Sequence, residues 1–285
     1  MSSGRTGRSD GRGSEGRRRL VLAAGALLAV AAAVAVGFYS GYRYARRSAS
    51  GHARPAPLSS TPATAPTAPA RSTAPHMNAR PVAATTGNWL VNPGFEQGAE
   101  GWKWLDWSQE WGPFEIADGI ATSGSKSAHL AVRGEPGGRP THVFGVVQEI
   151  APQVFPERMS GRYRVDRWEP GDARKVYLQA VVIATHPEGT LPSTQVRYIL
   201  EGVTVPPYDM SNARYRFFHS RAQPPMSQWI DFSLPVRQDF LQLWGKVPPP
   251  GTALRVLFEA RYDDKPAGGS VAADVYYDDL FIGVP

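Results

Sequence analysis

The chain has 285 residues, a formal net charge of +6 and no cysteine, and its length allows one or two domains. Without cysteine it forms no disulfide, no thiolate metal site and no lipid anchor on an N-terminal cysteine. The positive charge is uneven: residues 1–86 hold 12 Arg and no Lys against two acidic residues, which leaves 19 basic and 23 acidic residues for 87–285. The C-terminal part therefore lacks the excess of positive charge that binds nucleic acid.

Residues 20–42 are predicted to form one transmembrane helix. The run from Leu20 to Tyr39 carries no charge and reaches about 30 Å as a helix, enough to span a hydrocarbon core. More arginines precede the run than follow it, so the positive-inside rule places a cytoplasmic tail at 1–19 and the rest outside the cytoplasm. A cleaved signal peptide is the alternative. Because three arginines follow the run before any small-residue cleavage site, we expect an uncleaved signal-anchor in the cell membrane of a bacterial cell envelope.

Residues 43–86 are predicted to form a disordered linker. Ala, Pro, Ser and Thr dominate this stretch. Proline denies a helix its hydrogen bonds, and the small side chains bury little surface, so no core forms here. An extended spacer of this kind suits a domain that is held away from a membrane.

Residues 87–285 are predicted to form one all-β domain, because apolar and polar residues alternate in short runs that are broken by Gly, Pro, Asn and Asp. About ten strands without intervening helices indicate an antiparallel sandwich of two sheets. The run 175–184 is almost continuously apolar and is expected in the centre of a sheet. Three Pro-rich stretches are expected as loops: 206–210, 223–226 and 246–251.

Four motifs stand in order along this domain: NPGFE with a following Gly-Trp (92–102), SGSKS (123–127), QWIDFSLPV before PPPGTALRVLFEA (228–260), and YYDDL (276–280). This series resembles the carbohydrate-binding modules of the CenC type, which belong to the galactose-binding-like jelly rolls. The resemblance covers most of 88–285 and implies a jelly-roll β-sandwich that binds glycans. Residues 185–226 depart from the pattern because this stretch is longer and Pro-rich, and it either reshapes the ligand groove or covers it.

The resemblance also implies a structural calcium ion that joins the first and last strands. Carried over to this chain, Glu96 and Asp278 would be side-chain ligands, with Asp279 as the alternative to Asp278. The turn Ser125–Lys126 would supply a backbone carbonyl. Calcium prefers such oxygen ligands. The alternative is that the carboxylates only hydrogen-bond the backbone of a loop.

A glycan site needs an aromatic platform beside polar side chains. Trp102 is expected in the core and Trp104 fits the core by alternation, whereas Trp107 and Trp111 lie in a polar stretch and are the better platform candidates. Trp168 is a further candidate in an expected loop. The alternative is that all of these tryptophans pack into the core. Arginines on an outer strand face, Arg162 and Arg164 among them, would suit acidic sugars; ion pairs on a solvated face are the alternative. The full outer set is Arg133, Arg162, Arg164, Gln179, Arg197, Glu201, Arg255 and Glu259.

The sequence shows no nucleophile elbow, phosphate-binding loop, dinucleotide fingerprint or metal-binding His pair. Paired carboxylates for glycoside cleavage are remote in sequence and stay open, with Glu149, Glu201 and Glu259 on or near expected strands. We therefore expect a membrane-anchored, extracytoplasmic module that binds a polysaccharide or envelope glycan and is not an enzyme. A protein-interaction scaffold on the same jelly roll is the first alternative, and a glycoside hydrolase or lyase is the second.

Overall fold

The computed structural model describes residues 79–83, 86–106, 108–185 and 193–285. The expected cytoplasmic tail (1–19), transmembrane helix (20–42) and most of the linker (43–86) lie outside these residues. The chain divides into a unit Met1–Arg71 and a unit Ser72–Pro285, and everything described belongs to the second. Within the described ranges, no helix is long and apolar enough to cross a membrane.

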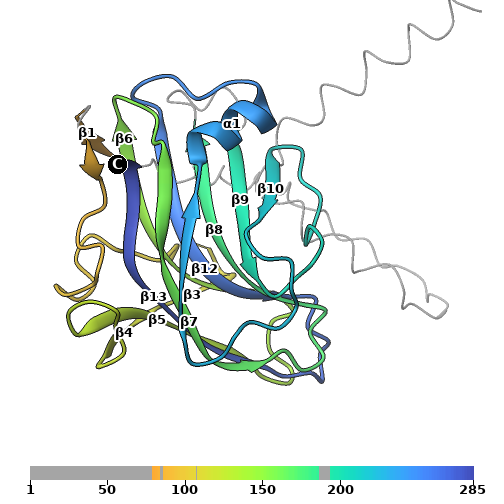
Figure 1. Cartoon of the computed structure of the whole chain (residues 1–285). Helices are drawn as coiled ribbons and strands as arrows, with labels where there is room; N and C mark the ends of the chain where they lie inside the picture. Colours follow the sequence, from red (N-terminus) through yellow and green to blue (C-terminus); the bar gives the residue numbers. More distant parts are fainter. Residues whose placement is uncertain (1–78, 84–85, 107, 186–192) are drawn as a thin grey trace, which may run out of the picture. The chain divides into compact units, whose positions relative to one another are not determined.

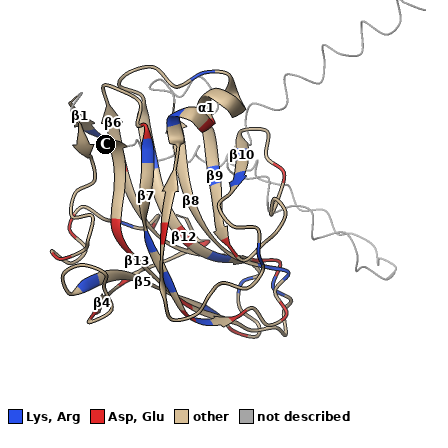
Figure 2. Ribbon diagram, in the orientation of Figure 1, with Lys and Arg blue, Asp and Glu red and all other residues tan. Residues whose placement is uncertain are grey.

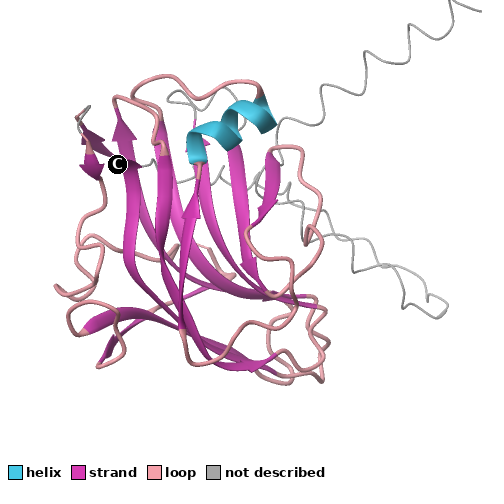
Figure 3. Cartoon of the chain, viewed as in Figure 1, coloured by secondary structure: helices cyan, strands magenta, loops and turns pink. Residues whose placement is uncertain are grey.

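Two β-sheets form the described unit (Figures 1 and 3). The larger sheet has the order β1 (Arg80–Val82), β6 (His142–Pro152), β12 (Ala253–Asp263), β8 (Lys175–Thr185), β9 (Thr194–Glu201) and β10 (Ala213–Phe217), with β3 (Trp111–Gly112) also on β6. The smaller sheet has the order β11 (Trp229–Leu234), β7 (Arg158–Glu169), β13 (Val271–Val284), β5 (Lys126–Gly134) and β4 (Glu115–Asp118), with β2 (Gly87–Asn88) on β13. The expected all-β sandwich is confirmed, with 175–185 inside a sheet.

The core lies between the sheets because each strand turns every second side chain inward. In β7, Tyr163 and Val165 are buried while Arg162 and Arg164 face outward, as their alternation predicts. In β12, Val256 and the residues two positions before and after it point into the same core. Tyr277 of β13 spans the gap, since its hydroxyl donates to the carbonyl oxygen of Glu259 at 3.1 Å.

The larger sheet also buries much of its outer face, which the sequence analysis expected to be polar and solvated. A second apolar cluster lies there, separate from the core and covered in part by the segment before β4. Its members are Leu105, Val147, Val181, Ile183 and Leu257, with Trp111 packed against them. Charged residues on this face are interspersed with the cluster, and Figure 2 shows basic and acidic residues side by side on several strands. Alternation correctly predicted which side chains point to the outer face, but it does not reveal which loops cover that face.

The helix α1 (Val236–Trp244) was not expected. Its sequence buries Val236 and Phe240, four residues apart on one helix face. Gly245 ends the helix at a φ of 71°, a left-handed conformation that glycine adopts without strain. Arg216 of β10 donates to Asp239 of the helix at 2.8 Å. A helix of nine residues gives only a short helical periodicity, which does not stand out in a sequence dominated by short strands.

Two further positions differ from the sequence analysis. Strand β1 lies inside the stretch 43–86 that was assigned to the linker, and it pairs in parallel with the end of β6, so residues 80–82 belong to the sandwich. Glu201 was placed on an outer face, but it is fully buried and contacts Tyr163 of the other sheet through a 2.6 Å hydrogen bond. A register shift between β8 and β9, next to Leu178, turns Glu201 inward.

Candidate functional site

The candidate site lies on the outer face of the larger sheet, where the pairing register brings polar residues of three strands into one row. Gly145 of β6 stands opposite Glu259 of β12, and Glu259 stands opposite Gln179 of β8. Arg197 of β9 lies opposite Val181, two residues further along β8. We call Glu259, Gln179 and Arg197 the polar row. β8 and β9 follow each other in the chain, but β12 comes only after β10, β11 and α1, so the folded sheet is what places Glu259 beside the other two.

Trp111 closes one end of the polar row. It belongs to the short strand β3, which runs parallel to β6 and pairs Trp111 with Val143. A methyl group placed on Gly145 would lie 3.0 Å from Cζ3 of Trp111 and 3.2 Å from Cγ of Glu259. The missing side chain at Gly145 therefore lets the indole ring lie beside Glu259. Trp111 packs against the second apolar cluster and is only partly buried, so part of its ring is exposed at this point.

Two buried polar atoms in the site have no hydrogen-bond partner among the residues that the structure describes. Gln179 is fully buried; its amide nitrogen donates to a carboxylate oxygen of Glu259, but its Oε1 accepts nothing. On the same face Nε of Arg261 is buried and unpartnered. Such orphaned atoms are uncommon, because an unmade hydrogen bond costs about 1–3 kcal/mol. One unused hydrogen-bond acceptor, Oε1 of Gln179, and one unused donor, Nε of Arg261, thus lie on the same face.

Tyr208 covers the other end of the polar row. Its hydroxyl accepts hydrogen bonds from Arg197 at 2.9 Å and from Arg261 at 3.4 Å. Both guanidinium carbons also lie near the face of its ring, at 5.6 Å and 5.5 Å from the centroid. Tyr208 belongs to the Pro-rich stretch 185–226, so the described part of that stretch covers this end of the face.

Ion pairs fix the flanks of the site. Glu149 binds Arg255 at 2.7 Å and Lys103 at 2.8 Å; burial favours the protonated carboxyl, but the two cations outweigh it and lower the pKa of Glu149. Asp263 behaves in the same way, because Arg261 at 2.6 Å lowers its pKa against the effect of burial. These carboxylates therefore stay charged. The pair Glu149–Arg255 joins β6 to β12, whereas the pair Asp263–Arg261 lies within β12.

The three carboxylates considered for glycoside cleavage do not form a pair. Glu201 lies between the sheets, where Arg221 and His219 bind it. Glu149 and Glu259 share the outer face, but Glu259 stands opposite Gly145, four residues from Glu149 along β6. At about 3.4 Å per residue their backbones are roughly 14 Å apart, beyond the span of about 5–9.5 Å that glycosidase carboxylates use.

Arg162 and Arg164 lie on the outer face of the smaller sheet, on the opposite side of the sandwich from Trp111. Arg162 binds Asp231 at 2.5 Å, which raises its pKa. Arg164 binds Asp166 at 2.7 Å. The structure therefore does not bring the expected ligand-binding residues together, and these two arginines are engaged in cross-strand and local ion pairs.

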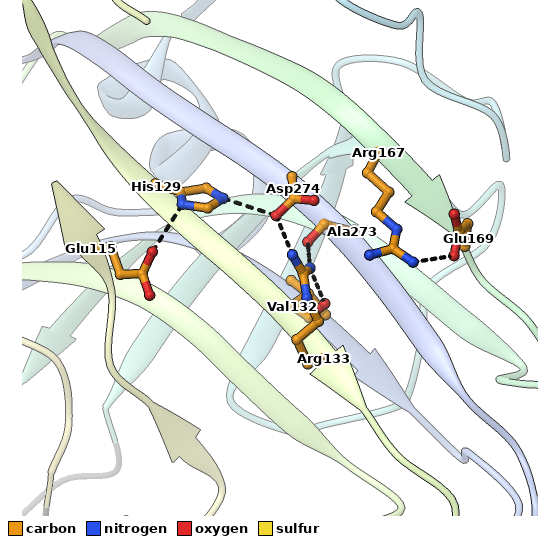
Figure 4. Close-up of polar contacts among 8 residues, drawn as sticks. All are labelled: Glu115, His129, Val132, Arg133, Arg167, Glu169, Ala273 and Asp274. Atoms are coloured by element: carbon orange, nitrogen blue, oxygen red, sulfur yellow. Dashed lines mark hydrogen bonds and ion pairs between the residues drawn. The ribbon is translucent and has the colours of Figure 1, made fainter. Parts of the chain in front are cut away.

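A polar network extends along the same outer face of the smaller sheet (Figure 4). His129 lies between two carboxylates, 3.2 Å from Glu115 and 2.9 Å from Asp274. Asp274 also binds Arg133 at 2.6 Å, which together with His129 lowers its pKa against the opposing effect of burial. The ring of His129 stacks on Tyr276 with centroids 4.6 Å apart. Because partners satisfy each of these groups, this face is best described as a structural ion-pair layer.

The remaining tryptophans divide between the core and the rest of the chain. Trp102 packs in the core, stacked on Phe95 at 5.0 Å, as expected. Trp104 is half-buried. Trp168 was expected in a loop, but it lies in β7 and packs against the core. The alternation at Tyr163 and Val165 does not predict this, because a register shift between β7 and β13 after Val165 changes which side chains face inward. Trp107 lies outside the described residues.

The five residues considered for calcium gather around one loop, 122–126. Oε1 of Glu96 accepts the backbone N–H groups of Ser125 at 3.0 Å and Lys126 at 2.8 Å, which lowers the pKa of Glu96. Asp278 is fully buried and accepts the N–H of Thr122 at 2.7 Å. Burial nevertheless raises the pKa of Asp278.

In this arrangement the donor set does not fit a calcium ion. The Glu96 and Asp278 carboxylates face N–H and O–H groups, which repel a cation, and the Ser125 carbonyl accepts the N–H of Gly119 at 2.8 Å. Asp279 in turn accepts from the hydroxyl of Thr122 at 2.6 Å. Within the described residues no group of three or more acidic or histidine side chains is arranged to hold a metal. The calcium ion that the resemblance implies is therefore given no role in the site proposed below.

Comparison with known proteins gives structural likenesses only, since no protein family and no curated protein matches the sequence. TmCBM61, solved in complex with β-1,4-galactotriose, is 10% identical, with a TM-score of 0.37 over 70% of this chain and 100% of that one. A non-crystalline-cellulose-specific carbohydrate-binding module, CBM28, is 12% identical, with a TM-score of 0.38 over 71% and 98%. The enzymatically active domain of tailspike protein 4 from bacteriophage CBA120 is 10% identical, with a TM-score of 0.37 over 70% and 21%.

These likenesses include β-sandwich carbohydrate-binding modules and one enzymatic domain. Identities and TM-scores this low do not decide what this chain binds. The two-sheet architecture stands on the strand pairing described above, and the CenC type expected from the motifs is not specifically matched among these structures.

Proposed function

We propose that this protein binds a polysaccharide through the outer face of the larger sheet, with Trp111 as the aromatic platform and the polar row beside it. The observation that carries the proposal is the pair of orphaned atoms, Oε1 of Gln179 and Nε of Arg261. A sugar hydroxyl donates and accepts at once, so a chain of sugars satisfies both kinds of atom. The apolar faces of sugar rings suit the indole of Trp111 and the apolar cluster beneath it.

We also propose that the chain is anchored in a membrane, which rests on residues outside the described ranges. The uncharged run 20–42 would anchor the chain in the membrane, and the stretch after it would hold the sandwich outside the cytoplasm, within reach of an envelope glycan. No catalytic step is proposed.

A glycan array of neutral, amino and acidic polysaccharides tests this function on the purified full-length chain. Trp111→Ala is expected to weaken binding at least tenfold, because a central aromatic contact contributes about 2 kcal/mol or more. The matched control is Trp229→Ala, which removes a half-buried tryptophan from the outer face of the smaller sheet. Equal loss in both variants would refute the assignment of the face.

A protein-interaction scaffold is the second candidate, and the cover formed by Tyr208 is the observation that favours it. Tyr208 occupies two arginines of the face, Arg197 and Arg261, so a jelly roll that has lost its sugar site would also look like this. A folded chain that binds no glycan on the array, with Trp111 intact, would favour the scaffold.

A further inference from the structure

We infer that one end of the sandwich, the end around α1, lies on an anionic lipid surface when the chain is anchored in its membrane. We call this surface the α1 end, and it consists of β1, the loop 153–158, α1 and the loop 245–252. The inference rests on the membrane anchoring proposed above and is independent of the glycan site, which lies on a face of the larger sheet.

Backbone hydrogen bonds hold these segments together. The N–H of Gln153 donates to the carbonyl oxygen of Val82 in β1 at 3.1 Å. The N–H of Gly251, in the loop that follows α1, donates to the carbonyl oxygen of Pro152 at 2.8 Å. The end of β6 thus has β1 on one side and the loop after α1 on the other, so β1 and α1 lie at the same end of the sandwich (Figure 1).

The α1 end is basic, whereas residues 87–285 together hold 19 basic and 23 acidic residues. Its segments contain four basic residues, each at least partly exposed: Arg80, Arg158, Arg237 and Lys246. The acidic residues of the same segments are Glu157 and Asp239. Asp239 is buried and bound by Arg216 of β10, so Glu157 is the one acidic side chain that these described segments expose. Basic side chains at such a surface are attracted to anionic lipid.

The same end exposes apolar side chains. Leu241 of α1 is 46% exposed, and Val154 in the neighbouring loop is 36% exposed. Leu241 follows Arg237 by one helical turn, on the face opposite the buried residues of α1. A helix that lies in a lipid interface combines apolar and basic side chains in this way.

The described residues expose two other large apolar side chains, Val205 and Met226. They lie in the segments 202–208 and 222–228, which contain no basic residue. Exposed apolar side chains that stand alone are ordinary on a protein surface. What distinguishes the α1 end is therefore the combination of apolar and basic side chains.

The path of the chain brings the α1 end to the bilayer. Every residue before β1, including the run 20–42 that we propose as the anchor, joins the sandwich through Arg80. An anchor would keep the domain beside the bilayer, so even a weak contact is populated. The expected linker permits this contact, because a flexible chain allows the domain both to lie on the surface and to stand away from it.

The glycan face stays accessible in this orientation. The strands β6, β12 and β8 run from the α1 end toward the opposite end, whereas the polar row crosses them. With the α1 end on lipid, the polar row runs parallel to the bilayer and faces sideways.

The test uses the full-length chain in vesicles. Because the chain has no cysteine, a single introduced cysteine carries a dye at a chosen point. Gln238→Cys places the dye on the exposed face of α1, and Ala267→Cys places it in an exposed loop before β13, at the opposite end. Energy transfer to a headgroup-labelled lipid is measured in phosphatidylcholine vesicles with and without phosphatidylglycerol.

We expect the dye at position 238 to transfer more strongly in the vesicles with phosphatidylglycerol, and high salt to remove the difference by screening. The dye at position 267 is expected to transfer weakly in both. Arg237→Gln and Lys246→Gln are each expected to lower the ratio of docked to free domain about fivefold. The matched control is Arg139→Gln with Arg174→Gln, which removes two exposed arginines at the opposite end and is expected to leave the ratio nearly unchanged.

Flotation of the vesicles after a high-salt wash reports the anchor separately. A chain that does not float would refute the anchoring and this inference with it, while the glycan array still tests the glycan site. A chain that floats but shows equal transfer in both lipids, or at both dye positions, would overturn the docking alone. Transfer that depends on the density of protein and not on lipid charge would indicate contact between copies of the chain and would also overturn it.

Discussion

Lys265 offers the sharpest test of the packing at the far end of β12. Only 3% of this residue is exposed, and its ammonium group donates to three backbone carbonyl oxygens: Glu135 at 2.8 Å, Gly269 at 3.1 Å and Pro266 at 3.3 Å. No carboxylate binds it among the described residues. The ammonium therefore holds the loop after β5 and the loop before β13 together.

The cost of Lys265→Met can be worked out from the partners of these carbonyls. Glu135 keeps a second donor in the N–H of Gly138, and Pro266 keeps one in the N–H of Gly269. Only the carbonyl of Gly269 loses its one described donor. One buried carbonyl without a partner costs about 1–3 kcal/mol, and methionine fills the space of the lysine stem. We expect a loss of about 2 kcal/mol, or a Tm lower by about 4–8 °C for a unit of this size.

Thermal and urea unfolding of the full-length chain measure this effect. The control is Lys246→Met, which removes an exposed lysine after α1 and is expected to change the free energy of unfolding by less than about 0.5 kcal/mol. If Lys265→Met unfolds like the control, the three carbonyls are satisfied without the ammonium, and the reasoning is refuted.

Three further predictions concern the candidate site, the stability of the chain at low pH and the loop 122–126. Gly145→Ala places a methyl group against Trp111 and the carbonyl of Phe258; titration is expected to show weaker glycan binding, and unchanged affinity would separate Trp111 from the site. The pKa of Asp263 is lowered in the folded protein, so its contribution to stability is present above the ordinary carboxyl pKa and is lost as pH falls through the pKa of the folded protein. Asp263→Asn is therefore expected to flatten the fall of Tm below about pH 4. If the curves of Tm against pH for the variant and the wild-type chain run parallel, this prediction is wrong. Glu96→Gln is expected to lower Tm by loosening the loop at Ser125, whereas melts of the wild-type chain with calcium and with EDTA are expected to coincide; a calcium-dependent rise in Tm would show that the loop binds the ion.

The sequence by itself determined the strand content and the inward face of most strands. Alternation at Tyr163 and Val165, and again around Val256, predicted which side chains form the core, because the period of a strand depends only on local backbone geometry. The breaks at Pro and Gly likewise predicted the loops. The same alternation, continued past Glu259, points Arg261 outward.

Tertiary structure alone decided which outer face is buried, and with it where the site lies. The pairing register set Glu259 beside Gln179, and a register shift turned Glu201 inward. The stretch 206–210 was expected as a loop, but only the folded structure shows that it places Tyr208 over Arg197. Each of these depends on how strands pair or how a loop packs on the folded sheet, and the period of a single strand does not reveal it. Strand period tells two faces apart, but only the packing of loops on a sheet decides which face water can reach.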